Sequence, residues 1–147
     1  MVRYSLFFIL VGGGRENTVR GNLIVDSGRA SIQYDDRNRD GFVNGGWAHS
    51  ATDTPGEGHW KRLAAIPYQG EPWLSRYPLL QKMKTSFETD PDDIDFPINP
   101  SYSQMRDNVV IAPKQDMYLI ADSVYTYSEV ADNTLYDTYE AAGWDPQ

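Results

Sequence analysis

The sequence predicts an all-β chain built as a parallel β-helix, in which each coil of the chain stacks on the next. Two observations carry this prediction. The strand-like runs are very short, and Gly, Asn, Asp or Ser separates them. Apolar residues also alternate along the runs, which places one row of side chains inward and the other outward. Inward Val, Ile and Leu side chains of successive coils would then form one continuous core.

The strand-like runs begin near residues 6, 17, 22 and 30. Leu6–Val11 is the first, and Gly12–Gly14 must turn after it because Gly adopts positive φ at no steric cost. Asn residues stand at the bends, where their side-chain amides can stack into ladders that satisfy neighbouring backbone groups. A second copy of the pattern comes much later, because Arg15–Val19 aligns with Arg106–Val110 in a basic, acidic, Asn and β-branched order.

Residues 37–105 differ in composition, being rich in Gly, Pro, Trp and charge. We expect them to be a mainly helical and loop insertion between coils of a single domain that covers residues 1–147. Proline positions set the expected elements. These are helices over 58–66, 72–77 and 79–84, and an extended loop over 90–100.

Charge and composition exclude several classes of protein. The 147 residues carry 13 Lys and Arg against 21 Asp and Glu, a net charge of −8, which argues against a nucleic-acid partner. The absence of Cys rules out disulfides and Cys-ligated zinc. No apolar run approaches the roughly 20 residues that a membrane-spanning helix needs. The first eleven residues imitate a secretory signal, but no convincing cleavage site follows, so we expect a buried strand there.

Three segments suggest a family. A glycine-rich entry to a coil covers residues 12–26, Pro72–Leu80 holds a Trp-x-x-Arg-Tyr-Pro element, and Arg106–Ile111 resumes the coil. Shorter pieces are Arg29-Ala30, Asp35–Arg37 and Gly46-Trp47. Together they resemble the right-handed parallel β-helix (pectate-lyase-like) superfamily, in a largely uncharacterised branch of right-handed β-helix repeat proteins. The likeness extends over about residues 6–115.

The resemblance implies a right-handed solenoid that is extracellular and acts on or binds polysaccharide, as a polysaccharide lyase or a glycoside hydrolase. It requires no cofactor. Relatives of this kind have many coils, whereas about three fit into this chain. A solenoid with so few coils is poorly capped, because each repeat is stabilised by its neighbours. The resemblance therefore also implies a fragment, a truncated gene model or a reduced paralogue.

Asp35, Asp36 and Arg37 are the candidate catalytic residues, at the end of a predicted strand. One carboxylate could act as general acid or base, and Arg37 could hold a uronate carboxylate through its bidentate fork. The two carboxylates point to opposite faces if the strand continues. The alternative is a solvated turn with a local Asp–Arg pair.

The same stretch has the opening spacing of a calcium loop, with Asp36, Asn38 and Asp40 as oxygen ligands followed by Gly41. Trp47 stands at the twelfth position, where such a loop requires a bidentate Glu. Calcium is therefore a possible cofactor, and an Asx turn is the alternative.

Trp47 and His49 are the candidate substrate-binding residues beside these acids. His49 and His59 match no standard zinc spacing. Trp73 and Tyr77 lie four apart and share a helix face. Their rings could stack on sugar faces in a carbohydrate groove, or they could hold short helices against the solenoid wall.

Three functions remain open at this point. A polysaccharide-cleaving enzyme predicts a groove where Asp35 or Asp36, Arg37 and Trp47 converge. A non-catalytic carbohydrate-binding or surface module predicts exposed aromatic rings without a convergent acid and base. A fragment of a longer solenoid, without independent function, predicts an exposed apolar cross-section at the coil ends.

Overall fold

The chain forms two compact units in a computed structural model that describes residues 9–44, 65–85 and 90–145. The first unit combines Met1–Asp36 with Pro100–Gln147, and the second is Arg37–Asn99. The second unit begins at the residue expected for the insertion but ends at Asn99 rather than at 105. The difference arises because the polar stretch after Asn99 is buried in the first unit, with Ser101 and Ser103 almost fully covered.

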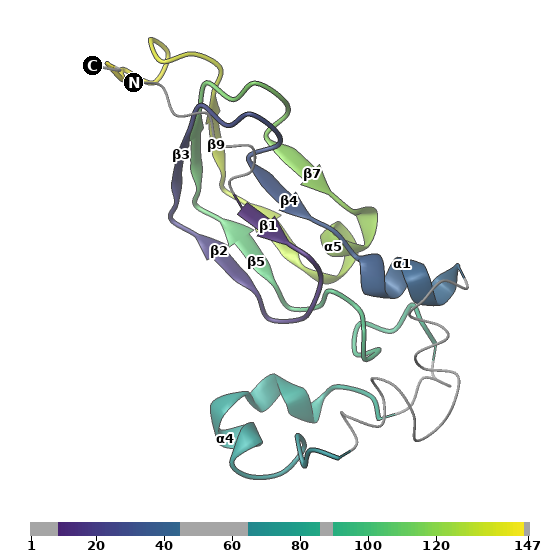
Figure 1. Cartoon of the computed structure of the whole chain (residues 1–147). Helices are drawn as coiled ribbons and strands as arrows, with labels where there is room; N and C mark the ends of the chain where they lie inside the picture. Colours follow the sequence, from purple (N-terminus) through teal and green to yellow (C-terminus); the bar gives the residue numbers. More distant parts are fainter. Residues whose placement is uncertain (1–8, 45–64, 86–89, 146–147) are drawn as a thin grey trace. The chain divides into compact units, whose positions relative to one another are not determined.

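The first unit is a stack of three coils in the part of the chain that is described, and each coil contains three strands (Figure 1). Coil 1 consists of β1 (Ile9–Val11), β2 (Thr18–Arg20) and β3 (Leu23–Val25). Coil 2 consists of β4 (Ile32–Tyr34), β5 (Gln104–Arg106) and β6 (Val109–Ile111). Coil 3 consists of β7 (Tyr118–Ile120), helix α5 (Asp122–Tyr127), β8 (Glu129–Ala131) and β9 (Thr134–Tyr136).

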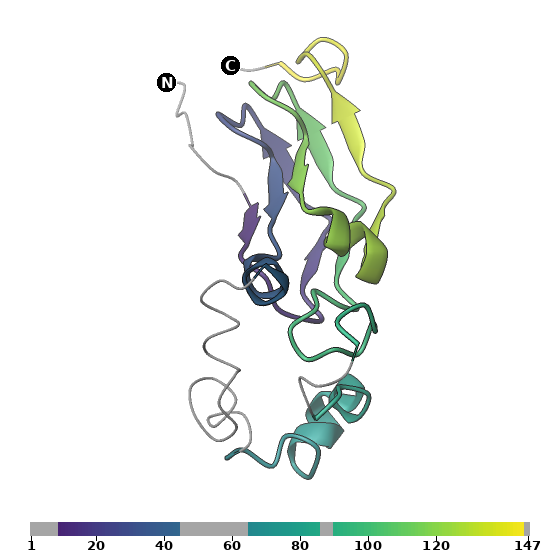
Figure 2. The ribbon, with the colours of Figure 1, turned by 90° about the vertical axis from the view of Figure 1, so that its right-hand side faces the viewer.

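Equivalent strands of the three coils pair side by side in parallel. The sheets have the orders β1-β4-β7, β2-β5-β8 and β3-β6-β9 (Figures 1 and 2). The all-β parallel solenoid predicted from the short runs is thereby confirmed. The observed starts at Thr18, Leu23 and Ile32 lie within two residues of the expected ones. The start expected near residue 6 lies outside the described residues.

The core is one column of inward side chains, as the alternation in the sequence predicts. In the third sheet, Ile24 and Val110 stack in register and are only 2% and 0% exposed. In the first sheet, Ile32 and Tyr34 point inward and are fully buried, while Gln33 between them points outward. The cluster as a whole is Val19, Ile24, Ile32, Tyr34, Met105, Val110, Met117 and Val124.

An asparagine ladder joins the second and third sheets. The side-chain amide of Asn22 donates to the Oδ1 atom of Asn108 at 2.8 Å, and that of Asn108 donates to the Oδ1 atom of Asn133 at 2.7 Å. The amide of Asn108 also donates to the carbonyl of Val19 at 3.0 Å. Stacked Asn side chains at the bends therefore form as expected, and they satisfy backbone groups that the turns leave unpaired.

A residue with positive φ precedes each Asn of this ladder. Gly21, Asp107 and Asp132 have φ values of 67°, 56° and 55°. Asp is among the residues that adopt this conformation most readily after Gly. The register shows that the alignment of Arg15–Val19 with Arg106–Val110 is wrong, because β3 pairs with β6 and Asn22, not Asn17, stacks on Asn108.

A second polar ladder stands before the second sheet. The backbone N–H of Asn17 donates to the hydroxyl of Ser103 at 3.1 Å, and the backbone N–H of Ser103 donates to the hydroxyl of Ser128 at 2.9 Å. The buried hydroxyl of Tyr34 lies among these groups, 3.0 Å from both Ser103 Oγ and Asn17 Nδ2, and donates to the carbonyl of Gly14 at 2.7 Å. Hydrogen bonds of Ser103 to the neighbouring coils therefore hold the segment before β5 in the solenoid, although this segment is polar.

The second unit contains short helices and turns in its described part. They are α1 (Arg37–Val43), α4 (Trp73–Arg76) and the 3₁₀ helix η1 (Pro78–Gln81). The helices expected over 72–77 and 79–84 are therefore present but shorter, and Pro78 separates them as the N1 residue of η1. Residues 58–64 of the other expected helix lie outside the described residues. The segment 90–99 consists of turns, and its Phe96 packs against Phe42 with ring centroids 5.2 Å apart.

Candidate ligand-binding site

The predicted acids lie at the end of the solenoid strand β4. The backbone N–H of Asp35 donates to the carbonyl of Val11 at 3.1 Å, which extends the pairing of β4 with β1 by one residue. The carboxylate of Asp36 accepts a hydrogen bond of 2.5 Å from the hydroxyl of Ser123 in α5. Both acids are half-buried, and Arg37 is the exposed first residue of α1. The carboxylate of Asp36 is thus tied to the neighbouring coil.

The predicted calcium ligands Asn38 and Asp40 lie on helix α1 rather than in a loop. Residues two apart on an α-helix are rotated by about 200° around its axis, so these two side chains leave on opposite sides. Asp40 accepts a 2.6 Å hydrogen bond from the side-chain amide of Asn44. Among the described residues, no three His, Asp or Glu side chains gather closely enough to share a metal ion. The calcium site stays a prediction from spacing, and this geometry does not support it.

The candidate substrate-binding residues Trp47 and His49 lie outside the described residues, as do His59 and Trp60. The convergence of Trp47 with Asp35 or Asp36, which distinguishes the enzyme from the binding module, therefore stays a prediction. Asp35, Asp36 and Arg37, which are described, stay predictions as catalytic residues.

A hollow lies at α4 and is lined entirely by described residues. Its volume is about 340 Å³, and its lining is Pro72, Trp73, Ser75, Arg76 and Tyr77. These residues belong to the Trp-x-x-Arg-Tyr-Pro element. From their spacing alone, Trp73 and Tyr77 could either bind a sugar or hold helices in place. In the structure their exposed fractions are 38% and 45%, so a large part of each ring is available to a ligand.

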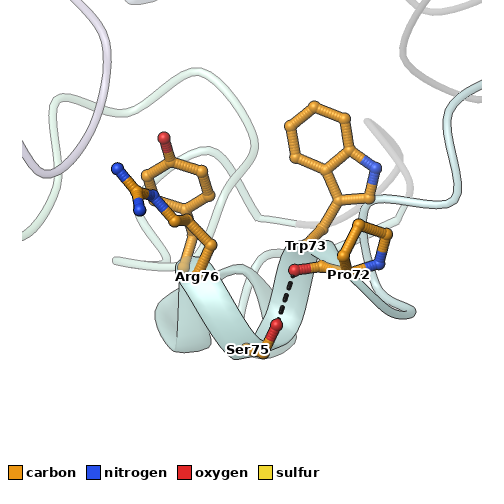
Figure 3. Close-up of a pocket in the computed structure, with 5 residues that line it drawn as sticks. Pro72, Trp73, Ser75 and Arg76 are labelled. Carbon is orange, nitrogen blue, oxygen red and sulfur yellow. Dashed lines mark hydrogen bonds between the residues drawn. The ribbon is translucent and has the colours of Figure 1, made fainter.

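Local hydrogen bonds hold the lining in place. The backbone N–H of Trp73 donates to the carbonyl of Gly70 at 3.0 Å, and the backbone N–H of Tyr77 donates to the carbonyl of Trp73 at 2.7 Å. The hydroxyl of Ser75 donates to the carbonyl of Pro72 at 2.8 Å, so it turns back onto the start of the helix (Figure 3). These hydrogen bonds fix the single turn of α4 at its start and its end, and the turn carries the side chains of Trp73, Arg76 and Tyr77.

Trp73 and Arg76 project from the same side of α4 (Figure 3). This follows from their spacing, because residues three apart on a helix are neighbours on its surface. The loop beneath is anchored by Gln69, whose side-chain amide donates to the carbonyl of Met83 at 2.8 Å. Tyr68, next to it, is buried, and the loss of hydration raises the pKa of its hydroxyl above 10.0.

The lining of this hollow carries groups that can contact a ligand. Trp73 and Tyr77 offer flat apolar faces with a polar edge, and Arg76 offers a planar fork of donors that matches a carboxylate. The lining contains no carboxylate and no His. The Trp-x-x-Arg-Tyr-Pro element identified Trp73 and Tyr77 as possible sugar-stacking rings, but the predicted substrate-binding residues were Trp47 and His49.

A charged cluster lies on the outer face of the second sheet. Arg106 pairs with Asp107 at 3.1 Å, with Glu129 at 3.2 Å and with Asp132 at 2.9 Å. The charges of Asp107 and Glu129 raise the pKa of the Arg106 guanidinium above its ordinary value. Arg20 also pairs with Asp107, at 2.8 Å. Because each cation is matched by carboxylates of its own or the next coil, this cluster ties coils together and offers little to a charged ligand.

Comparison with protein-family models, with curated proteins and with solved structures found no match to this chain. The fold assignment therefore depends on the strand register and the stacked sheets themselves. None of the helices in the described ranges is long and apolar enough to cross a membrane.

Proposed function

We propose that this chain is a carbohydrate-binding β-helix protein that binds an acidic oligosaccharide in the hollow at α4. The observation that carries the proposal is the presence of Trp73, Tyr77 and Arg76 in the lining of one hollow, with both rings substantially exposed. Aromatic faces stack on the apolar faces of sugar rings, and a guanidinium pairs with the carboxylate of a uronate. An apolar pocket with a few oriented polar groups is the common form of a small-ligand site.

The solenoid is consistent with this proposal and with the pectate-lyase-like resemblance. We infer that the coils are right-handed, because parallel strands of one sheet are joined by right-handed crossovers in nearly all proteins. The resemblance also implies an extracellular location, where polysaccharides are the natural ligands. Both inferences go beyond the stacked parallel sheets and are part of the proposal.

Titration of the full chain with oligogalacturonate, followed by calorimetry, tests the proposal. We expect Trp73→Ala and Tyr77→Ala each to weaken binding by about tenfold or more, as truncation of a central aromatic contact does in other interfaces. Trp144→Ala is the matched control, because Trp144 is 42% exposed but lies outside the hollow. Equal affinity of the wild type and Trp73→Ala would refute the site.

Arg76→Gln separates charge recognition from ring stacking. It should lower the affinity for oligogalacturonate while leaving the affinity for a neutral oligosaccharide of the same length unchanged. If Arg76→Gln lowered both affinities equally, Arg76 would support the local structure and not select an acidic ligand. Trp73→Ala should weaken both ligands.

Cleavage of a polysaccharide, with Asp35 and Asp36 as the catalytic acids, is the second candidate function. The observation in its favour is the fixed carboxylate of Asp36, which Ser123 holds at the edge of the solenoid. A lyase would release an unsaturated uronate that absorbs in the ultraviolet, whereas a hydrolase would release a reducing end without it. Incubation of polygalacturonate with the wild type and with Asp36→Asn distinguishes these outcomes from binding alone.

A further inference from the structure

The core of coil 3 is left open on one side. Its inward residues continue the columns of coils 1 and 2, since Leu135 stacks in register on Val110. Val110 is fully buried, whereas Leu135 is 43% exposed. On the strands of coil 3, the core-packed Tyr118, Ile120 and Val130 are only half-buried, whereas Val124 of α5 is fully buried. The described residues therefore leave an apolar surface, the open end of coil 3, which a further coil would cover.

Strand edges reinforce this feature. In the described residues β7, β8 and β9 each pair with a neighbour on one side only, and β1, β2 and β3 form the opposite edges of the same sheets. The unpaired N–H and C=O groups of an edge strand are a template for another parallel strand. The end of coil 3 and the start of coil 1 thus have the backbone groups that coils 1 and 2 already use to pair.

The asparagine ladder gives the two ends complementary hydrogen-bonding groups. The backbone N–H of Asn22 donates to the Oδ1 atom of Asn108 at 3.1 Å, and that of Asn108 donates to the Oδ1 atom of Asn133 at 3.1 Å. Within the described ranges, the backbone N–H of Asn133 has no acceptor and the Oδ1 atom of Asn22 has no donor. One end of the ladder therefore lacks the group that the other end supplies.

The charges of the two ends are also opposite. From residue 116 onward the chain has no Lys or Arg, and it has seven carboxylates, namely Asp116, Asp122, Glu129, Asp132, Asp137, Glu140 and Asp145. Coil 1 and the turn after it, residues 9–31, have a net charge of +1, with Arg15, Arg20 and Arg29 against Glu16 and Asp26, and Arg20 also pairs with Asp107 of coil 2. Opposite charge favours contact between the two ends and disfavours contact between two identical ends.

We propose that a second copy of this chain stacks its coil 1 on the open end of coil 3, so that the solenoid continues from one copy into the next. In this arrangement Asn133 donates to Asn22 of the next copy, and Leu135 becomes buried as Val110 is. The contact joins two different surfaces, so it is heterologous and repeats from copy to copy instead of stopping at a dimer. The proposal does not depend on the carbohydrate-binding function.

Sedimentation velocity of the full chain over a range of concentrations up to about 1 mM tests the proposal, since even a weak contact is half-occupied there. We expect the wild-type mass to rise beyond that of a dimer as the concentration increases. Leu135→Lys should reduce the association constant at least tenfold, because stacking would bury its charge without a partner. Leu119→Lys is the matched control, because Leu119 is in the same coil but points outward and is 59% exposed.

Mixing the variants provides a second readout. Leu135→Lys retains an intact coil 1, so it should bind the open coil 3 of a wild-type copy and end the stack, which lowers the wild-type mass. Leu119→Lys should not do so. Circular dichroism checks that each variant melts cooperatively, and Leu135→Gln replaces Leu135→Lys if the latter does not. A wild type that stays monomeric, a mass that stops at two copies, or equal effects of the two Lys variants would overturn the proposal.

Discussion

Replacing Asn108 with Ala would remove the centre of the ladder that joins the second and third sheets. Asn108 is fully buried. Its amide donates to the carbonyl of Val19 at 3.0 Å and to Asn133 Oδ1 at 2.7 Å. Its Oδ1 atom accepts from the backbone N–H of Asn22 at 3.1 Å and from the side-chain amide of Asn22 at 2.8 Å. The substitution therefore removes hydrogen bonds to partners in coils 1 and 3.

The expected loss of stability follows from these contacts. A hydrogen bond contributes about 0.5–1.5 kcal/mol net, and a buried partner left unsatisfied costs about 1–3 kcal/mol. Water can reach the partly exposed Asn22 and Asn133 after the substitution, but not the carbonyl of Val19 as readily. We therefore expect Asn108→Ala to lower the free energy of unfolding by about 3–5 kcal/mol, a large share of a typical domain's stability.

Urea unfolding followed by far-ultraviolet circular dichroism measures this loss. With a slope of about 2 kcal/mol/M, a loss of about 4 kcal/mol moves the midpoint by about 2 M. The matched control is Asn22→Ala, which removes the same groups at the end of the ladder. The side chain of Asn22 makes a single hydrogen bond in the described structure, so about 1 kcal/mol is expected. Losses that agree within about 0.5 kcal/mol would refute the reasoning, because burial and bond number would then not determine the cost.

Three further outcomes are expected. Tyr34→Phe should lower the free energy of unfolding by about 1–3 kcal/mol, since the buried hydroxyl hydrogen-bonds to three partners. Tyr125→Phe, at an exposed ring, is the control and should leave the urea midpoint nearly unchanged. Similar shifts of the urea midpoint in the two variants would contradict this prediction. Because burial raises the pKa of Tyr68, its contribution to stability is present below pH 10 and is lost as the pH rises through its raised pKa in the folded state. Tyr68→Phe should therefore lessen the fall in melting temperature above pH 10, and an unchanged fall would refute that role. Arg106→Gln should lower the melting temperature most at low salt, with a difference that shrinks in high salt; a salt-independent difference would show that its ion pairs are not the cause.

The solenoid could be predicted because its signals are local. Three-residue apolar runs, alternation and Asn bends are all visible in one coil. The register was not predicted correctly, because Glu16 and Asp107 both adopt positive φ before a polar residue and a strand. They do so at different corners of the coil, one before the second sheet and one before the third. The same local turn chemistry therefore produced a sequence match between segments that do not stack, and Gly21, the true counterpart of Asp107, looked dissimilar.

The candidate site could be predicted only in part. The Trp-x-x-Arg-Tyr-Pro element was recognised, but a Trp and a Tyr four residues apart look the same in the sequence whether they are buried or exposed. Exposure depends on the tertiary packing around Trp73 and Tyr77, which a local pattern does not contain. The acids were predicted from charge density, whereas the structure shows the carboxylate of Asp36 tied to Ser123, a residue far away in the sequence.

The architecture separates stability from binding, and this separation can be tested. Coil 1 passes from its first to its second sheet through Gly12–Gly14, coil 2 through the whole second unit and coil 3 through α5. This corner tolerates such differences because the polar ladder of Asn17, Ser103 and Ser128 re-establishes the register before the second sheet. Substitutions in separate compact units should therefore act additively. Trp73→Ala should weaken binding by about tenfold or more without moving the solenoid's unfolding midpoint, and Asn22→Ala should move the midpoint without changing the affinity.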